Sequence, residues 1–199
     1  SDQLGLPLED VSNTLTQEQL ESHLWAAANI LRGSIDSGDY KHYIFGLLFY
    51  KRLCDVWNEE YEDLVEEFDG DTEMAVDPEE HRFDIPFGCM WSEDLRPDPT
   101  DEEWPTNDKG QKIPKTIREW SKDIGTALNM AFRQIEDKNP RLKGVFQDVD
   151  FANKERFPDT MLEQLLQHFE KHRMRKSDVD SDVLGNAYEY LIAKFADDA

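Results

Sequence analysis

One continuous helical pattern, residues 39–68, constrains the fold of this 199-residue chain more than any other feature. Its first half, residues 43–50, is apolar almost all round, which is typical of a helix buried at the centre of a bundle. Its second half keeps one apolar stripe that includes Trp57, Tyr61 and Leu64, with carboxylates elsewhere. At ~1.5 Å per residue such a helix spans roughly 45 Å. The pattern predicts a long central helix around which the rest of the chain packs.

Four further helical patterns accompany it. The first, residues 16–33, opens on a capping box at Thr16 and closes on a glycine. The second, residues 114–140, opens on a proline, which suits a first helical position. The third, residues 159–169, opens on an aspartate that we expect to cap it. The fourth starts near Asp182 and is predicted to bury Leu184, Tyr188, Leu191, Ile192 and Phe195.

The remaining long segment, residues 69–113, is rich in proline and acidic residues and has little periodicity, which predicts irregular chain. A loop of this length in a compact domain is usually functional or partly mobile. Since no alternating strand pattern and no repeat is present, we predict an all-α fold, an irregular bundle of about five main helices. We expect a tail at 1–15, then one helical domain at 16–199 with an irregular insert at about 69–113. Apolar anchors should attach this insert to the core: Phe83, Ile85, Phe87, Met90, Trp91 and Leu95.

The charge balance is strongly acidic, with 22 Lys and Arg against 44 Asp and Glu and a formal net charge of −22. A nucleic-acid-binding domain normally shows a basic footprint, because phosphate contacts supply most of its affinity. The composition therefore argues against DNA as a ligand of the whole surface. Thirteen of the acidic residues lie in residues 55–80, which contain no Lys or Arg, and such a run is usually a solvated face or loop.

Other compositional features point to a cytoplasmic protein that does not enter a membrane. Apolar residues make up 38% of the chain, enough for a packed core, but no apolar run approaches the ~20 residues that cross a bilayer. The N-terminus lacks the basic and apolar regions of a signal peptide. Cys54 and Cys89 both lie among apolar residues, so we expect two reduced, packed thiols.

The stretch from Asp182 to Ala196 resembles the helix that closes the N-terminal helical domain of the modification (M) subunit of type I restriction–modification DNA methyltransferases. Residues 24–53 are similar to the opening helix pair of that family, in which Leu-Arg-Gly and Tyr-Lys precede an apolar Gly-Leu-Leu-Phe helix. Residues 83–95 look like its aromatic–proline–tryptophan loop, and residues 124–146 match a third segment. The resemblance covers about residues 20–196.

The resemblance implies a parent protein that methylates adenine in DNA with S-adenosylmethionine. Its expected partners are a specificity (S) subunit, a second M subunit, a restriction (R) subunit and double-stranded DNA. The family's catalytic motifs, Phe-x-Gly-x-Gly and Asn-Pro-Pro-Phe/Tyr, have only incomplete counterparts here, at residues 87–90 and 139–142. We therefore predict no catalytic residue, no cofactor-binding residue and no activity for this chain alone.

Two patterns have the spacing of metal ligands, but a plainer interpretation fits each. His168 and His172 lie one helical turn apart, a spacing that can ligate a metal, yet it also fits a surface pair. Residues 178–189 match the acidic positions of a calcium loop, but Val183 stands where glycine permits the sharp turn. A looser match at residues 69–80 lacks the same glycine. We predict no metal site.

Two basic segments are candidates for contact with DNA phosphates. Lys115, Arg118 and Lys122 would lie on one side of the helix expected from residue 114, with Lys112 just upstream. The second segment, residues 171–176, contains no acidic residue. The alternative for both segments is that their side chains are ordinary solvated surface charges that contact no DNA. The candidate contacts are Lys112, Lys115, Arg118, Lys122, Lys171, Arg173, Arg175 and Lys176.

A rival hypothesis belongs to a different class, an acidic protein-interaction module without a methyltransferase connection. Its carboxylates would imitate DNA phosphates and occupy a basic partner. The tract at 55–80 would then be the mimic, and the net charge of −22 suits this function.

Overall fold

A computed structural model describes residues 14–198 and confirms the all-α fold. No β-strand occurs within these residues, where only isolated bridges are found. The helices of this part of the chain are α1 (Gln17–Leu31), α2 (Tyr40–Glu67), α3 (Thr72–Val76), α4 (Ile124–Lys138), α5 (Asp159–Phe169) and α6 (Ser181–Asp198).

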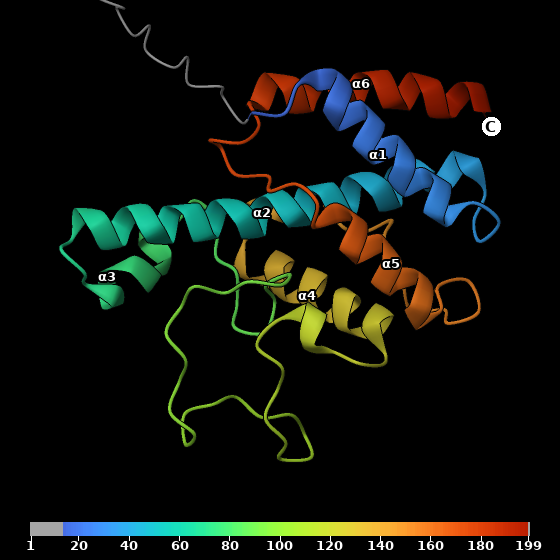
Figure 1. The fold of residues 1–199 in the computed structure, drawn as a ribbon. Helices are drawn as coiled ribbons and strands as arrows, with labels where there is room; N and C mark the ends of the chain where they lie inside the picture. Colours follow the sequence, from blue (N-terminus) through green and yellow to red (C-terminus); the bar gives the residue numbers. More distant parts are fainter. Residues whose placement is uncertain (1–13, 199) are drawn as a thin grey trace, which may run out of the picture.

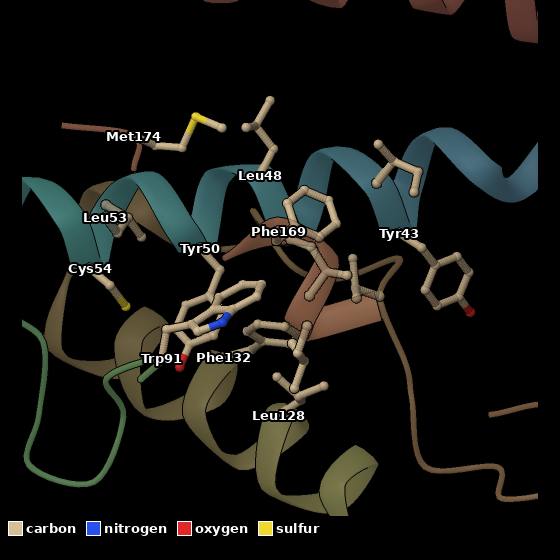
Figure 2. Close-up of a cluster of buried hydrophobic side chains, with 14 of the residues drawn as sticks. Tyr43, Leu48, Tyr50, Leu53, Cys54, Trp91, Leu128, Phe132, Phe169 and Met174 are labelled. Atoms are coloured by element: carbon tan, nitrogen blue, oxygen red, sulfur yellow. The ribbon is translucent and has the colours of Figure 1, made fainter. Parts of the chain in front are cut away.

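Helix α2 is the central element, as the apolar pattern predicted. Figure 1 shows it running through the middle of the molecule, with α1 and α6 on one side and α4 on the other, while α5 packs against both α1 and α4. Its side chains enter the core on opposite sides, and Figure 2 shows Tyr50 pointing toward Trp91 and Phe132 while Leu48 points the other way. The Tyr50 hydroxyl donates to the carbonyl of Cys89 at 2.5 Å, so this buried polar atom is satisfied.

The first helix begins as predicted. Thr16 Oγ1 accepts from the backbone N–H of Gln19, and the Gln19 side chain accepts from the N–H of Thr16, which completes the capping box. The helix ends at Leu31, and Gly33 follows with φ +84°. This left-handed conformation favours glycine, which explains why the chain can turn there.

The prediction that a helix begins at Pro114 was wrong, because α4 begins only at Ile124. Residues 116–118 instead run beside the insert: the N–H of Ile117 donates to the carbonyl of Met90 and that of Arg118 donates to the carbonyl of Trp91. Only a short 3-10 turn, Ile117–Glu119, forms in this segment. As a result, Lys115, Arg118 and Lys122 do not share a helical face.

The expectation that Asp159 caps its own helix was also wrong. Pro158 occupies the N-cap of α5, and Asp159 is the first helical residue. The Asp159 carboxylate instead accepts from the N–H groups of Asp123 and Ile124, at 3.1 and 3.0 Å. It thereby satisfies free donors at the start of α4, which fixes the first turn of α4 against α5.

The insert is irregular as predicted, apart from α3 and a 3-10 turn at Pro78–Glu80. Ile85, Met90 and Trp91 are buried, while Phe83 and Leu95 pack partly buried against the core. Two buried asparagines also hold it. Asn58 bonds to the backbone of Glu93 and Leu95, and Asn139 bonds to both backbone groups of Asp84.

The register of α6 differs in part from the prediction. Ala187, Leu191 and Phe195 are buried, whereas Leu184 and Ile192 are only partly buried and Tyr188 is 47% exposed. Residues 187, 191 and 195 repeat every fourth position, so they form the stripe that packs against α1 and α2. The adjacent stripe with Tyr188 borders a groove instead.

Both cysteines are buried and free, in agreement with the prediction. Burial raises the pKa of the Cys54 thiol and raises that of Cys89 to about 12. Both are therefore thiols near neutral pH and are poor nucleophiles. Within the described residues, no helix combines the length and apolar character needed to span a membrane.

Candidate nucleic-acid interface

In the first basic segment, residues 112–122, the leading lysines are engaged in ion pairs. Lys112 Nζ lies 2.6 Å from a carboxylate oxygen of Asp101, and both groups are well exposed. Lys115 Nζ lies 2.6 Å from Asp98 and is only 14% exposed. An ion pair offsets much of the field that a lone lysine would present to a phosphate, so neither residue offers a free charge.

Arg118 connects the first basic segment to the second. Its Nε donates to Glu170 Oε1 at 2.5 Å, and the indole N–H of Trp91 donates to the same oxygen at 3.2 Å. Glu170 directly precedes Lys171, the first residue of the second segment. The structure therefore brings the two segments together at Glu170, although they lie about fifty residues apart in the sequence.

The second segment, residues 171–176, is a turn region between α5 and α6. Arg175 forms a bidentate ion pair with Asp178, with N–O distances of 2.8 and 3.2 Å, and this pair raises the pKa of the Arg175 guanidinium. Arg173 lies 3.9 Å from Glu93, with both side chains more than half exposed. Arg175 therefore stabilises the local turn, and Arg173 makes a surface contact with Glu93.

Three candidates retain free charge. Lys122, Lys171 and Lys176 are exposed, and they form no ion pair with side chains that the structure describes. The other five candidates are paired. If the domain contacts DNA phosphates through the predicted residues, we expect these three lysines to make the strongest contribution.

The acidic tract is mostly solvent-exposed, as expected for a solvated face. Asp55 is an exception, because it pairs with buried Lys51 at 2.5 Å and burial raises the pKa of its carboxyl. Glu59 accepts from the backbone N–H groups of Lys176 and Ser177, so the tract lies against the second basic segment. The exposed acids are Glu62, Asp63, Glu66, Glu67, Asp69, Asp71, Glu73, Glu79 and Glu80.

The histidine pair is not a surface pair. His168 is buried and stacks on His23 of α1, with ring centroids 4.5 Å apart, and His172 meets His23 edge-on at 4.7 Å. His168 Nε2 donates to the backbone carbonyl of His23 at 2.7 Å. Burial, followed by the neighbouring histidines and Lys171, lowers the pKa of His23 to about 3. The three rings form a contact between α1 and the C-terminal end of α5.

No group of three or more His, Cys, Asp or Glu side chains in the described part of the chain could hold a metal ion. In the calcium-like pattern at 178–189, Asp178 pairs with Arg175, and Asp182 and Glu189 belong to the helix from Ser181. In the looser pattern at 69–80, Asp71 caps α3 through the N–H groups of Glu73 and Met74. Local structure therefore accounts for both acidic patterns.

Sequence reasoning missed two carboxylates that position the candidate interface. Glu170 joins the two basic segments through Arg118, and Asp159 fixes the start of α4 just after Lys122. Both act on residues more than thirty positions away, and no short-range spacing signals such a contact. A helix cap is normally sought within a few residues of the helix it serves.

Comparison with known proteins identifies the family. The family described as the HsdM N-terminal domain matches residues 20–169. The methylase subunit of the type I restriction enzyme MpnII from Mycoplasma pneumoniae is 25% identical, over 90% of this chain and 35% of its own length. The methylase subunit of MjaIX from Methanocaldococcus jannaschii is also 25% identical, over 90% of this chain and 31% of its length.

A solved structure shows the same fold. The type I restriction–modification methyltransferase subunit from Streptococcus thermophilus superposes with a TM-score of 0.63 at 22% identity, covering 93% of this chain and 40% of that one. This chain thus spans about a third of the length of the curated relatives it matches.

The fold and the matched segments define a helical domain of type I restriction–modification methyltransferases. The chain belongs to the HsdM N-terminal domain family, which is the domain that the resemblance indicated. This finding contradicts the rival hypothesis of an acidic module without a methyltransferase connection.

Proposed function

We propose that the parent protein methylates adenine in DNA with S-adenosylmethionine, as the modification subunit of a cytoplasmic type I complex. Its partners are a specificity subunit, a second modification subunit and a restriction subunit. The match of the HsdM N-terminal domain family to residues 20–169 is the observation that carries this proposal. The relatives, named as methylase subunits, support it.

The role we assign to residues 16–199 is structural: closing the subunits around DNA, touching backbone phosphates and contacting partner subunits. The tail expected at residues 1–15 lies outside the described residues except for its last two, and of these Leu15 is buried in the core. The catalytic motifs have no complete counterpart in residues 1–199, so methyl transfer belongs to the rest of the parent protein. Neither the cofactor nor the target adenine is then bound by this domain.

Contact with DNA must be local, because the net charge of −22 repels a polyanion. At physiological salt, attraction is screened beyond about 8–10 Å, so only lysines close to phosphates contribute. Lys122, Lys171 and Lys176 meet this requirement best, because they are exposed and unpaired with described side chains. Lys171 and Lys176 belong to the second segment, which Arg118 and Glu170 hold beside the first.

Replacing Lys122, Lys171 and Lys176 together by alanine in the complete methyltransferase should weaken DNA binding equally for all sequences. The slope of log affinity against log salt should flatten by up to about 0.9 for each phosphate that the variant no longer touches. Sequence preference should remain, because base reading belongs to another subunit. Fluorescence anisotropy with specific and unrelated duplexes, measured across a salt series, gives both quantities.

The matched control replaces Arg133, Lys138 and Lys143, three exposed cations outside both basic segments. This variant removes the same charge and should bind DNA like the wild type. If the two triple variants behave alike, the predicted segments do not contact the backbone. The domain would then serve the complex through protein contacts alone.

A further inference from the structure

An apolar groove runs along one face of α2, between α6 and the turns that follow α4. Its larger part, about 590 Å³, lies between Phe49 of α2 and Tyr188 of α6. An adjoining part of about 360 Å³ continues along α2 to Glu60. The two parts share Phe49, Arg52 and Leu184, so they form one continuous surface feature.

The groove leaves large apolar side chains in contact with solvent. Tyr188 is 47% exposed on its α6 wall, and Val145 is 42% exposed on the opposite wall. An exposed apolar patch with a polar rim marks an interaction site more often than an inert surface. On the α6 wall, Gly185 has no atom within 4 Å of the position where a Cβ would lie, so the groove is open there.

The shape of the groove follows a helix. Its floor is a stripe of α2 residues that runs from Lys41 through Phe45, Phe49 and Val56 to Glu60. At ~1.5 Å per residue this stripe is roughly 28 Å long. A helix of about five turns has this length, and docking of an amphipathic helix in an apolar groove is a common recognition mode.

The charge at the groove is opposite to that of the chain as a whole. Lys41 lines one end, and Arg82 and Lys176 line the other, against the two acids Asp148 and Glu60. In the whole chain, acidic residues outnumber Lys and Arg by two to one. Electrostatic complementarity therefore favours a ligand that carries carboxylates near both ends of its apolar stripe.

We propose that this groove binds an amphipathic helix of a partner protein, with its apolar stripe against α2 and its carboxylates near Lys41 at one end and Lys176 at the other. The proposal deepens the partner contacts of the proposed function, on which it rests for the existence of a partner. It requires neither methyl transfer nor DNA, so its test can succeed or fail independently of them.

Two synthetic 20-residue helical peptides with the same leucine stripe test the proposal, one with glutamates and the other with lysines near both ends. Fluorescence anisotropy with the 199-residue chain should give a Kd for the glutamate peptide at least about ten-fold lower than for the lysine peptide. Gly185→Glu should weaken binding of the glutamate peptide by about ten-fold or more, since it adds a carboxylate to the groove.

Two variants make this experiment specific. Asn186→Glu adds the same charge at the next position of α6, outside the groove lining, and should change the Kd by less than about two-fold. The double variant Lys41→Glu with Lys176→Glu should reverse the preference in favour of the lysine peptide. Equal binding of both peptides, binding of neither, or an unchanged Kd in Gly185→Glu would overturn the proposal.

Two further outcomes would assign the groove to a different occupant and would also overturn the proposal. One is displacement of the glutamate peptide by a peptide with the sequence of residues 1–13. The other is a dimer of the chain, seen by analytical ultracentrifugation, that Gly185→Glu dissociates and Asn186→Glu does not.

Discussion

Gly125→Ala is expected to destabilise the domain by at least about 3 kcal/mol. Gly125 is the second residue of α4 and is buried. A Cβ atom added there would lie 2.0 Å from the backbone oxygen of Phe151 and 2.9 Å from its carbonyl carbon. These are backbone atoms, which cannot rotate away as a side chain could. Either α4 or the chain around Phe151 must therefore shift, which disturbs the packing around the buried Phe151 side chain.

Urea denaturation of Gly125→Ala and of Gly185→Ala measures this effect with a matched control. Both glycines lie in helices, but Gly185 has open space where its Cβ would be. Gly185→Ala should therefore stabilise the domain by about 0.5–1 kcal/mol through helix propensity. Similar urea midpoints for the two variants would show that α4 does not approach Phe151 this closely.

The second large effect is a loss of stability on acidification, caused by His23. Burial lowers the pKa of His23 from 6.5 to about 3 in the folded state. Below pH 6.5 the unfolded chain therefore binds a proton that the folded chain cannot accept, so unfolding becomes more favourable as the pH falls. Between pH 7 and pH 5 this residue alone should reduce the free energy of unfolding by about 2 kcal/mol.

Several charged groups surround His23, so a variant is needed to isolate its effect. His168, His172, Lys171 and Lys51 all act to lower its pKa, and burial lowers the pKa of His168 as well. The raised pKa of Asp55 acts in the opposite direction, because the folded state then takes up a proton more readily than the unfolded one.

His23→Leu keeps an apolar side chain in the cluster and removes the titrating group, as well as a buried Nε2 that has no hydrogen-bond partner among the described residues. The difference in the free energy of unfolding between pH 7 and pH 5, measured in urea, should be smaller in His23→Leu by about 2 kcal/mol. An equal pH dependence in both proteins would mean that His23 is accessible to protons in the folded state.

The sequence predicted those elements whose cause is local. The long central helix follows from the apolar pattern at 43–50, and the start of the first helix follows from Thr16 and Gln19. The start of α4 could not be read in the same way, since it depends on Asp159, 35 positions from Ile124. Without that contact, the proline at 114 looked like the better starting point.

Prediction of the candidate site and of the exposed surface was limited by the same dependence on contacts between residues far apart in the sequence. Periodicity showed which residues of the last helix share a side, but not which side a neighbour covers, so Tyr188 was predicted to be buried. Spacing also could not show that Lys115 pairs with Asp98 and Arg118 with Glu170. The location of free charge depends on partners that only the folded chain brings together.

Methyl transfer to duplex DNA by the complete parent protein, assembled with the specificity subunit that we propose as its partner, tests the central claim most directly. With tritiated S-adenosylmethionine, the complex should place label on adenine, and residues 1–199 alone should transfer none and show no micromolar cofactor binding by calorimetry. Label on cytosine, no label from the assembled complex, or transfer by residues 1–199 alone would contradict the proposed function.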